Sequence, residues 1–241
     1  MIVVNEGARC PFLFIGDHAG RAIPQALGDL GVGREDLARH IAWDIGVAAV
    51  GEHLARRLGA CFIRQAYSRL VIDCNRAPAT VGATPPVSDG VPIPGNTGVP
   101  VEQRAARVAA IYQPYQDAIA AELDRRAALG SDPILVSLHS FTPSLQGVPR
   151  PWRYGVLHGE DSPFSSCMLS GMEQALGEAV GDNQPYALNE IDNTVPLHAG
   201  GRGLDYLELE IRQDLIAEPP GQAEVAAEVA GFLLAALALK T

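Results

Sequence analysis

Short apolar runs alternate along this chain with longer segments of helical periodicity, and this alternation is the strongest constraint on its fold. The predicted strands are 11–15, 61–65, 70–73, 134–138, 153–157 and 207–211, and the predicted helices are 34–58, 101–129, 163–179 and 222–239. Such alternation is typical of an α/β domain, in which helices cover a sheet. The 241 residues show no internal repeat and no second core, so we expect residues 1–241 to form a single domain.

Glycine and proline interrupt two of the predicted helices. Gly46 and Gly51 weaken the helix at 34–58, so we expect it to break near Trp43 and Asp44.

The helix at 101–129 contains Pro114, which should kink it. The segment 78–100 before it is rich in Pro and Gly, and we expect it to be a functional loop over the domain.

The charge balance excludes two classes of partner. Lys and Arg total 18 against 28 Asp and Glu, a net charge of −10 at pH 7. This argues against binding to nucleic acid or to an anionic membrane surface, since both need clustered positive charge. A small anionic substrate stays open, because a few arginines can reverse the sign inside a pocket.

We expect a cytoplasmic protein with reduced thiols. The first residues show no signal-peptide pattern. The longest apolar stretch, 229–239, is about half the roughly 20 residues that a membrane span needs, which favours a buried core helix. The four cysteines are widely spaced and form no CxxC pair (Cys10, Cys61, Cys74 and Cys167).

A histidine lies just beyond the carboxyl end of two predicted strands. His18 lies in GDHAG, directly after the first predicted strand, and His139 follows ILVSL. Ligands of open α/β sheets bind at the carboxyl ends of the strands, and neutral imidazole is a common metal ligand. The pattern indicates a histidine-based site for a divalent ion, and the alternative is two histidines hydrogen-bonded in turns.

A basic and amide cluster follows the early strands. Arg69 lies in YSRL, and Asn75 and Arg76 lie in DCNR. The guanidinium fork and the amide suit a carboxylate, which indicates an anion site. The alternative is that Arg76 pairs structurally with Asp73 or Asp17.

The sequence YLELEIR places carboxylates on one face of a strand. Glu208, Glu210 and Arg212 alternate with apolar residues. Glu210 is nearer the carboxyl end and is the better candidate for a general base. An exposed edge strand with a Glu/Arg ladder is the alternative.

The motifs GDHAG, HIAWDIG, YSRLVIDCNRAP, SLHSFTP, NQPY and HAGGRGLDYLELEIRQDLI, in this order, resemble the N-formylglutamate amidohydrolases. The order is similar, more distantly, to that of zinc carboxypeptidases and aspartoacylase-like deacylases. The resemblance implies a three-layer α/β/α fold around a central mixed, mostly parallel sheet, like that of the zinc exopeptidases.

The resemblance also implies roles for individual residues. His18 and His139 would bind one divalent metal ion, expected to be Zn²⁺. Asn75 and Arg76 would hold the substrate carboxylate, and Glu210 would be the catalytic base.

Two further residues follow from the same resemblance. Arg69 would polarise the amide oxygen, and His198 would donate to the developing oxyanion. The alternative for His198 is a surface histidine flanked by Gly200 and Gly201.

The chain departs from the carboxypeptidase pattern at the third metal ligand. That pattern has a Glu three residues after the first histidine, where this chain has Arg21. We take Asp44 as the third ligand, with Asp17 and then His40 as weaker candidates. A helix N-cap is the other interpretation of Asp44.

The implied activity is metal-dependent hydrolysis of a small anionic N-acyl amino acid, with N-formyl-L-glutamate, yielding formate and L-glutamate, as the first expectation. The alternatives are another N-acyl amino acid, a small peptide or cyclic amide, or a catalytically degenerate binding module, which Arg21 would favour. We expect 78–100 and 182–203 to shape the side-chain pocket, and Arg150, Arg153 and Arg202 are candidates for reading a second carboxylate.

Overall fold

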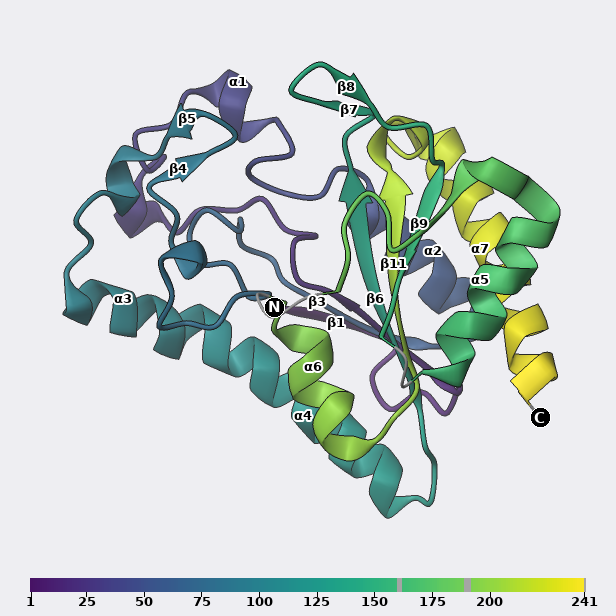
Figure 1. Ribbon diagram of the computed structural model, residues 1–241. Coiled ribbons are helices and arrows are strands. Elements are labelled where there is room, and N and C mark those ends of the chain that lie inside the picture. The colour runs from purple at the N-terminus through teal and green to yellow at the C-terminus, as the bar shows by residue number, and fades with distance from the viewer. Residues whose placement is uncertain (160–161, 189–191, 241) are drawn as a thin grey trace.

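A computed structural model describes residues 1–159, 162–188 and 192–240, and its centre is a sheet of seven strands in the order β1-β3-β2-β6-β11-β9-β10 (Figure 1). The strands are β1 (Ile2–Val4), β2 (Phe12–Gly16), β3 (Cys61–Arg64), β6 (Ile134–Phe141), β9 (Tyr154–Leu157), β10 (Val180–Asp182) and β11 (Tyr206–Arg212). Strands β3, β2, β6 and β11 run parallel, whereas β1 and β9 are antiparallel to their inner neighbours. The expected mixed, mostly parallel sheet is confirmed.

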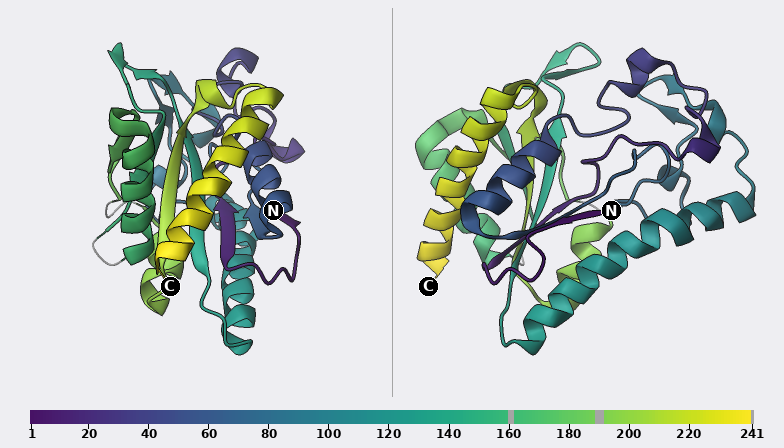
Figure 2. Two further views of the ribbon diagram at one scale, coloured as in Figure 1. Left: turned by 90° about the vertical axis from the view of Figure 1, so that its right-hand side faces the viewer. Right: turned by 180° about the vertical axis from the view of Figure 1, so that it is seen from behind.

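Helices cover both faces of the sheet, which confirms the three-layer architecture (Figures 1 and 2). The helices are α1 (Arg34–Leu37), α2 (Val47–Leu58), α3 (Val101–Arg107), α4 (Gln113–Ala128), α5 (Pro163–Leu176), α6 (Thr194–His198) and α7 (Pro219–Lys240). Single 3₁₀ turns lie at Gln25–Leu27, Val81–Ala83, Pro94–Asn96, Gly177–Ala179, Gly200–Arg202 and Gln213–Leu215. Helices α2, α5 and α7 pack on one face, and α4 and α6 lie on the other.

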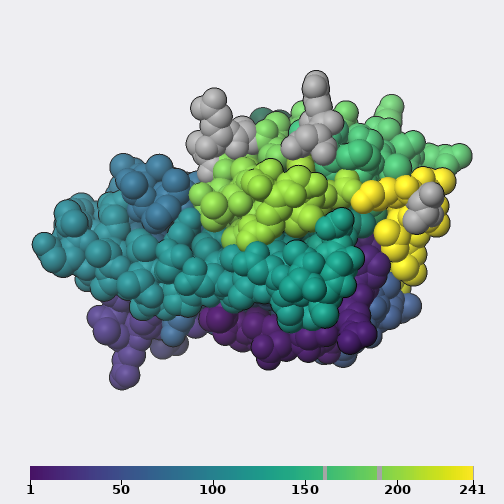
Figure 3. All heavy atoms as spheres, turned by 90° about the horizontal axis from the view of Figure 1, so that it is seen from below, coloured from purple at the N-terminus to yellow at the C-terminus, as the bar shows by residue number. Residues whose placement is uncertain are grey.

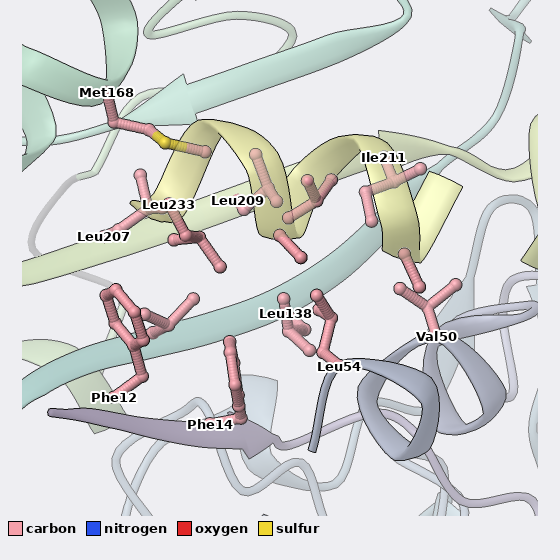
Figure 4. Packing of buried hydrophobic residues seen from close by; sticks show 14 of the residues in the cluster. Phe12, Phe14, Val50, Leu54, Leu138, Met168, Leu207, Leu209, Ile211 and Leu233 are labelled. Carbon is pink, nitrogen blue, oxygen red and sulfur yellow. The ribbon is translucent and has the colours of Figure 1, made fainter. Parts of the chain in front are cut away.

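The core on the α2/α5/α7 face is apolar along most of the length of the strands (Figure 4). Alternate residues of each strand point to it, as the period of two requires. Phe14 and Leu209 from the sheet pack with Leu54 of α2, Met168 of α5 and Leu233 of α7.

The opposite face changes character along the strands. At the start of the strands, Leu13 and its neighbour Leu135 belong to one apolar cluster with Ile119 of α4. Helix α6 lies against α4 over this part of the molecule (Figure 3). Towards the carboxyl ends of β6 and β11 the same face carries His139 and Glu210. The apolar helices therefore cover only part of this face, and its polar end remains for a site.

The predicted strand at 70–73 is wrong. Leu70, Val71 and Ile72 are buried but lie in a loop. Side chains take the place of a strand partner, because Asn96 donates to the Leu70 carbonyl at 2.8 Å and Arg107 donates to the Val71 carbonyl at 2.9 Å.

Both predicted helix interruptions occur. The segment 34–58 divides into α1 and α2, and Gly46 has φ 83° directly before α2, where a Cβ would lie 2.2 Å from the Ile216 oxygen. The segment 101–129 contains a π-helical turn, Val108–Tyr112, between α3 and α4, and the turn ends two residues before Pro114. Such a turn accommodates a proline that cannot continue the hydrogen-bond ladder.

The segment 78–100 is more ordered than we expected. It contains the hairpin β4 (Val87–Ser88) and β5 (Val91–Pro92), and a second small hairpin, β7 (Ser144–Leu145) and β8 (Val148–Pro149), follows β6.

Helix α7 is, by length and composition alone, the one helix of the described residues that could cross a membrane, with mean hydropathy 1.6 over the tested window. At 22 residues it is longer than the apolar stretch seen in the sequence. One side packs into the core through Val225, Val229 and Leu233. The predicted core helix is confirmed.

Candidate active site

A cavity of about 280 Å³ opens at the carboxyl ends of β2, β6 and β11. Its walls come from the loops after β2 and β3, from the ends of β6 and β11, and from the segment after β10. The lining residues are His18, His40, Asp44, Arg69, Asn75, Arg76, His139, Ser140, Phe141, Thr142, Leu157, Tyr186, Ala187, Asp192, Glu208 and Glu210.

His18 lies two residues beyond β2 and is buried. Its Nε2 lies 2.7 Å from Asp73 Oδ1. Burial raises the pKa of Asp73, but His18 and Arg69 more than offset this and hold it well below its ordinary value, so the carboxylate accepts and Nε2 carries the proton. The buried Nδ1 of His18 has no hydrogen-bond partner among the described residues, and in the neutral imidazole it would offer its lone pair to a ligand.

His139 lies on β6 and is 4% exposed. Its Nδ1 lies 2.9 Å from Asp44 Oδ2, and its Nε2 lies 3.1 Å from Ser137 Oγ and 3.6 Å from Asp17 Oδ2. Burial lowers the pKa of His139, but the contacts with Asp17 and Asp44 outweigh burial and raise the pKa well above its ordinary value.

Asp44 lies in the loop between α1 and α2, and backbone contacts fix its position. Its N–H donates to the His18 carbonyl at 2.8 Å, and the Ser140 N–H donates to its Oδ2 at 3.2 Å. Burial raises the pKa of Asp44, but His18 and His139 more than offset this and hold it well below its ordinary value. The N-cap interpretation is wrong, because Gly46 precedes α2 and no side chain caps it.

The donor set fits a divalent metal ion. His18, Asp44 and His139 each offer a ligand atom, and these atoms lie within 4.8 Å of one another. Two imidazoles and one carboxylate are common ligands of such ions. The carboxylates of Asp73 and Asp17 lie 2.7 Å from His18 Nε2 and 3.6 Å from His139 Nε2, where they would orient the two rings towards an ion.

Asp17 and His40, the weaker candidates for a third ligand, contact other side chains, and Arg21 contacts Trp43. Arg21 is exposed, with its guanidinium carbon 5.2 Å from the centre of the Trp43 ring. His40 lines the cavity, but its Nε2 lies 3.5 Å from Asp89. Asp17 accepts a hydrogen bond from Thr194 at 2.8 Å.

Glu208 and Glu210 lie on a central strand, so the edge-strand alternative is wrong. Glu208 is paired with Ser137 of β6, and Glu210 with His139. Both are buried, and an Oε2 atom of each has no hydrogen-bond partner among the described residues. Burial raises the pKa of Glu208 to about 8 and that of Glu210 to about 7.

Asn75 and Arg76 already contact a carboxylate of the chain itself. Arg76 Nη1 donates to Asp192 Oδ1 at 3.0 Å, and Asn75 Nδ2 donates to the same oxygen at 3.3 Å. The backbone N–H groups of Asn193 and Thr194 donate to Asn75 Oδ1, which turns the amide donor towards the cavity. Among the described residues, Arg76 forms an ion pair with Asp192. The structural alternative from the sequence names Asp73 or Asp17 as its partner.

Arg69 bridges two of the acids around the histidines. It donates to Asp44 Oδ1 at 3.4 Å and to Asp73 Oδ2 at 3.2 Å. The side chain is 27% exposed and lines the cavity, so it both holds Asp44 and faces the space that a substrate would fill.

The structure does not bring His198 to the cavity. It lies in α6, is buried rather than on the surface, and its Nε2 lies 2.7 Å from Gln116 Oε1. Burial lowers the pKa of His198 to about 4.

Sequence reasoning did not assign Tyr186 and Asp192 to the site. Tyr186 belongs to the NQPY motif, which was the only signal for it, and Asp192 lies in the segment 182–203. Residues 189–191 of that segment lie outside the described residues. No residue of 78–100 lines the cavity; Pro85 and Ser88 line a smaller neighbouring cavity.

A three-layer α/β/α fold with buried acids and histidines in a cavity at the carboxyl edge of its sheet has the features of an enzyme with its active site there. Residues 10–217 match the sequence model of the N-formylglutamate amidohydrolase family. The chain belongs to this family of hydrolases, which act on amide C–N bonds.

Two solved structures are similar over nearly the whole chain. The gene product Atu2144 from Agrobacterium tumefaciens shares 37% identity, with a TM-score of 0.95 over 98% of this chain and 94% of its own. The N-formylglutamate amidohydrolase from Ralstonia eutropha JMP134 shares 18% identity, with a TM-score of 0.68 over 97% of this chain and 95% of its own, and supports the fold alone. A search of curated proteins gave no match.

Proposed function

We propose that the protein hydrolyses the amide bond of a small anionic N-acyl amino acid, with N-formyl-L-glutamate, giving formate and L-glutamate, as the first substrate to test. The observation that carries this proposal is the convergence of His18, Asp44 and His139 beside the unpartnered carboxylate of Glu210 in one cavity. Metal donors next to a base are the parts that metal-assisted hydrolysis needs. Membership of the family supports the formyl substrate.

His18, Asp44 and His139 would hold one divalent ion, for which Zn²⁺ is the first candidate given two imidazoles and a carboxylate. When bound, such an ion polarises a carbonyl group and acidifies water. Asp73 and Asp17 keep the two imidazoles oriented.

Glu210 is the proposed base. It takes a proton from the attacking water as the C–O bond forms, and it gives that proton to the amine nitrogen as the C–N bond breaks. Its position across from His139 favours it over Glu208, which is paired with Ser137 further from the strand end. Arg69 is placed to donate to the developing oxyanion, whereas His198 has no role here because it is buried against Gln116.

Asn75 and Arg76 hold the α-carboxylate of the substrate in this proposal. The Asp192 carboxylate supports the assignment, because it accepts from both residues. The substrate carboxylate would replace that of Asp192, which orients the amide towards the histidines and Glu210.

The test is formate release from N-formyl-L-glutamate by purified protein, measured with added Zn²⁺ and with a chelator. Release that the chelator abolishes and Zn²⁺ restores supports the reaction and the metal together. Release that a chelator leaves unchanged would overturn the metal assignment. A metal-loaded protein that releases no acid from any N-acyl amino acid would instead favour a binding module.

A further inference from the structure

A second cavity, of about 270 Å³, lies at the edge of the sheet opposite the active site. Its lining residues belong to the segment before β2, the C-terminal end of α4 and the loop before β6; they are Ala8, Arg9, Arg125, Arg126, Leu129 and Ser131. In Figure 1 this end of α4 lies at the bottom of the view, whereas the β7–β8 hairpin that follows β6 lies at the top. The cavity therefore lies at the amino ends of β2 and β6, and the active-site cavity lies at their carboxyl ends.

The lining of this second cavity is basic, in a chain whose net charge is −10. Three of the six described residues that line it are arginines, and none of the six is acidic. Two of these arginines share one carboxylate, because Glu122 Oε1 accepts from Arg125 Nη2 and from Arg126 Nε, both at 2.8 Å. Arg9 is exposed and forms no ion pair with a carboxylate of the described residues. Three positive charges thus face one negative charge, which leaves a surplus of two.

Arg126 is a buried guanidinium whose hydrogen bonds are incomplete. The residue is 2% exposed. Its Nε donates to Glu122 and its Nη1 donates to the Cys10 carbonyl, but its buried Nη2 has no hydrogen-bond partner among the described residues. A buried donor without an acceptor is costly. A water molecule would complete the hydrogen bond without balancing the charge, whereas an anion in the cavity would do both.

Arginines near the C-terminus of a helix can also have a purely structural role, since they stabilise the negative end of the helix dipole. Here the backbone already closes the end of α4, because the N–H groups of Leu129 and Ser131 both donate to the Arg126 carbonyl at 3.0 Å. The guanidinium of Arg125 instead reaches the segment before β2, where it donates to the Ala8 carbonyl at 3.0 Å. The structural role leaves the cavity and the unpartnered Nη2 unexplained.

A phosphate group fits these donors and charges. It carries about two negative charges at neutral pH, which equals the positive surplus, whereas a single carboxylate supplies one. The guanidinium fork binds phosphate oxygens through paired hydrogen bonds. The hydroxyl group of Ser131 also lines the cavity and can donate to a further oxygen. Because the cavity is about as large as the active-site cavity, it has room for a small organic group beyond the phosphate.

We propose that Arg9, Arg125 and Arg126 form a second binding site, at the amino edge of the sheet, for the phosphate group of a small molecule. The ligand is inorganic phosphate or a small phosphate monoester, which present the same group to the arginines. The site is independent of the hydrolytic reaction proposed above, and a failure of that reaction leaves it standing.

The experiment is calorimetric titration of the metal-loaded protein with inorganic phosphate and, separately, with glycerol phosphate. We expect one molecule to bind per chain. Arg9→Gln combined with Arg125→Gln should weaken binding by at least about 10-fold, the effect of losing a charge-assisted hydrogen bond. This variant keeps Arg126 to pair with Glu122 in the fold. Arg34→Gln is the matched control, because it removes the charge of an exposed arginine of α1 that does not line the cavity.

Thermal unfolding gives a second readout of the same site. Phosphate should raise the Tm of the wild type and of Arg34→Gln, since it binds the folded chain, and should leave the Tm of the double variant unchanged. The same measurement shows whether the double variant folds. If it does not fold, Arg9→Gln with Ser131→Ala takes its place in both experiments.

The two probes identify the source of the phosphate group. Tighter binding of glycerol phosphate assigns the site to a phosphate monoester, and binding of inorganic phosphate that is equal or tighter assigns it to the free ion; both support the site. No binding of either probe at millimolar concentration would overturn it. Binding that Arg76→Ala weakens and the double variant leaves unchanged would place the anion in the active site, which also overturns the proposal.

Discussion

Glu210 on β11 is paired with His139 on the parallel strand β6. The pairing puts a carboxylate beside a histidine at the polar end of one sheet face. Glu208 and Ser137 form the corresponding pair two residues earlier along the same two strands, on the same face of the sheet. Both glutamates are buried on the same strand, and Glu210 lies nearer to its carboxyl end. A substitution at one position is therefore a control for the same substitution at the other.

Glu210→Gln should lower kcat for N-formyl-L-glutamate by about 10²- to 10⁴-fold with little change in KM, since it removes a proton carrier without a binding contact. Glu208→Gln should lower kcat by much less. Steady-state formate release measures both. The assignment of the base would be reversed if Glu208→Gln were the more damaged variant.

His139→Ala should lose the bound metal. The wild type is expected to hold about one equivalent of zinc or a similar divalent ion per chain, measured by elemental analysis after dialysis. His158→Ala is the matched control, because that histidine pairs with Asp182 outside the cavity. Equal metal content in His139→Ala and the wild type would remove His139 from the site.

The main sheet and the two histidines could be predicted because their signals are local. Apolar runs mark the central strands, and the carboxyl ends of parallel strands meet at one edge. The role of Asp44 could not be decided locally, since an N-cap and a ligand need the same residue type. Gly46 at the N-cap position of α2 excludes the N-cap interpretation, and the hydrogen bond from the Asp44 N–H to the His18 carbonyl, a tertiary contact, places Asp44 beside the histidines.

The loop at 70–73 shows why other parts could not be predicted. Leu70 and Val71 are apolar residues of the kind that buried strands contain, and both are indeed buried. Their carbonyls, however, are satisfied by side chains of Asn96 and Arg107, which lie far along the chain and carry no local signal. The same holds for Asp192, whose contact with Arg76 depends on how a distant loop packs.

Asp192→Asn should lower KM for the substrate, because it removes the carboxylate that competes for Asn75 and Arg76. Arg76→Ala should raise KM, since the clamp loses its charge. Both are read from initial rates of formate release over a range of substrate concentrations. An increase in KM for Asp192→Asn would mean that Asp192 holds Arg76 in its binding position.

Gly20→Ala should destabilise the protein by about 1–3 kcal/mol, the usual cost of overpacking. A Cβ there would lie 2.2 Å from the Ala66 carbonyl carbon, and the loop carrying His18 would have to move. Gly171→Ala in α5 meets no atom within 4 Å and should stabilise by up to about 1 kcal/mol. Urea unfolding measures both, and equal stability of the two variants would contradict the close packing at Gly20.

His198 should make folding stability fall as the pH is lowered from about 6.5 towards 4. Burial lowers the pKa of His198 to about 4 in the folded state, against about 6.5 when unfolded. Between these values the unfolded chain binds the extra proton, so acidification favours unfolding, by about 2 kcal/mol between pH 7 and pH 5. Over this range the free energy of unfolding of His198→Gln, measured by urea titration, should fall by about 2 kcal/mol less than that of the wild type. Parallel pH profiles for wild type and His198→Gln would show that His198 takes up its proton without unfolding.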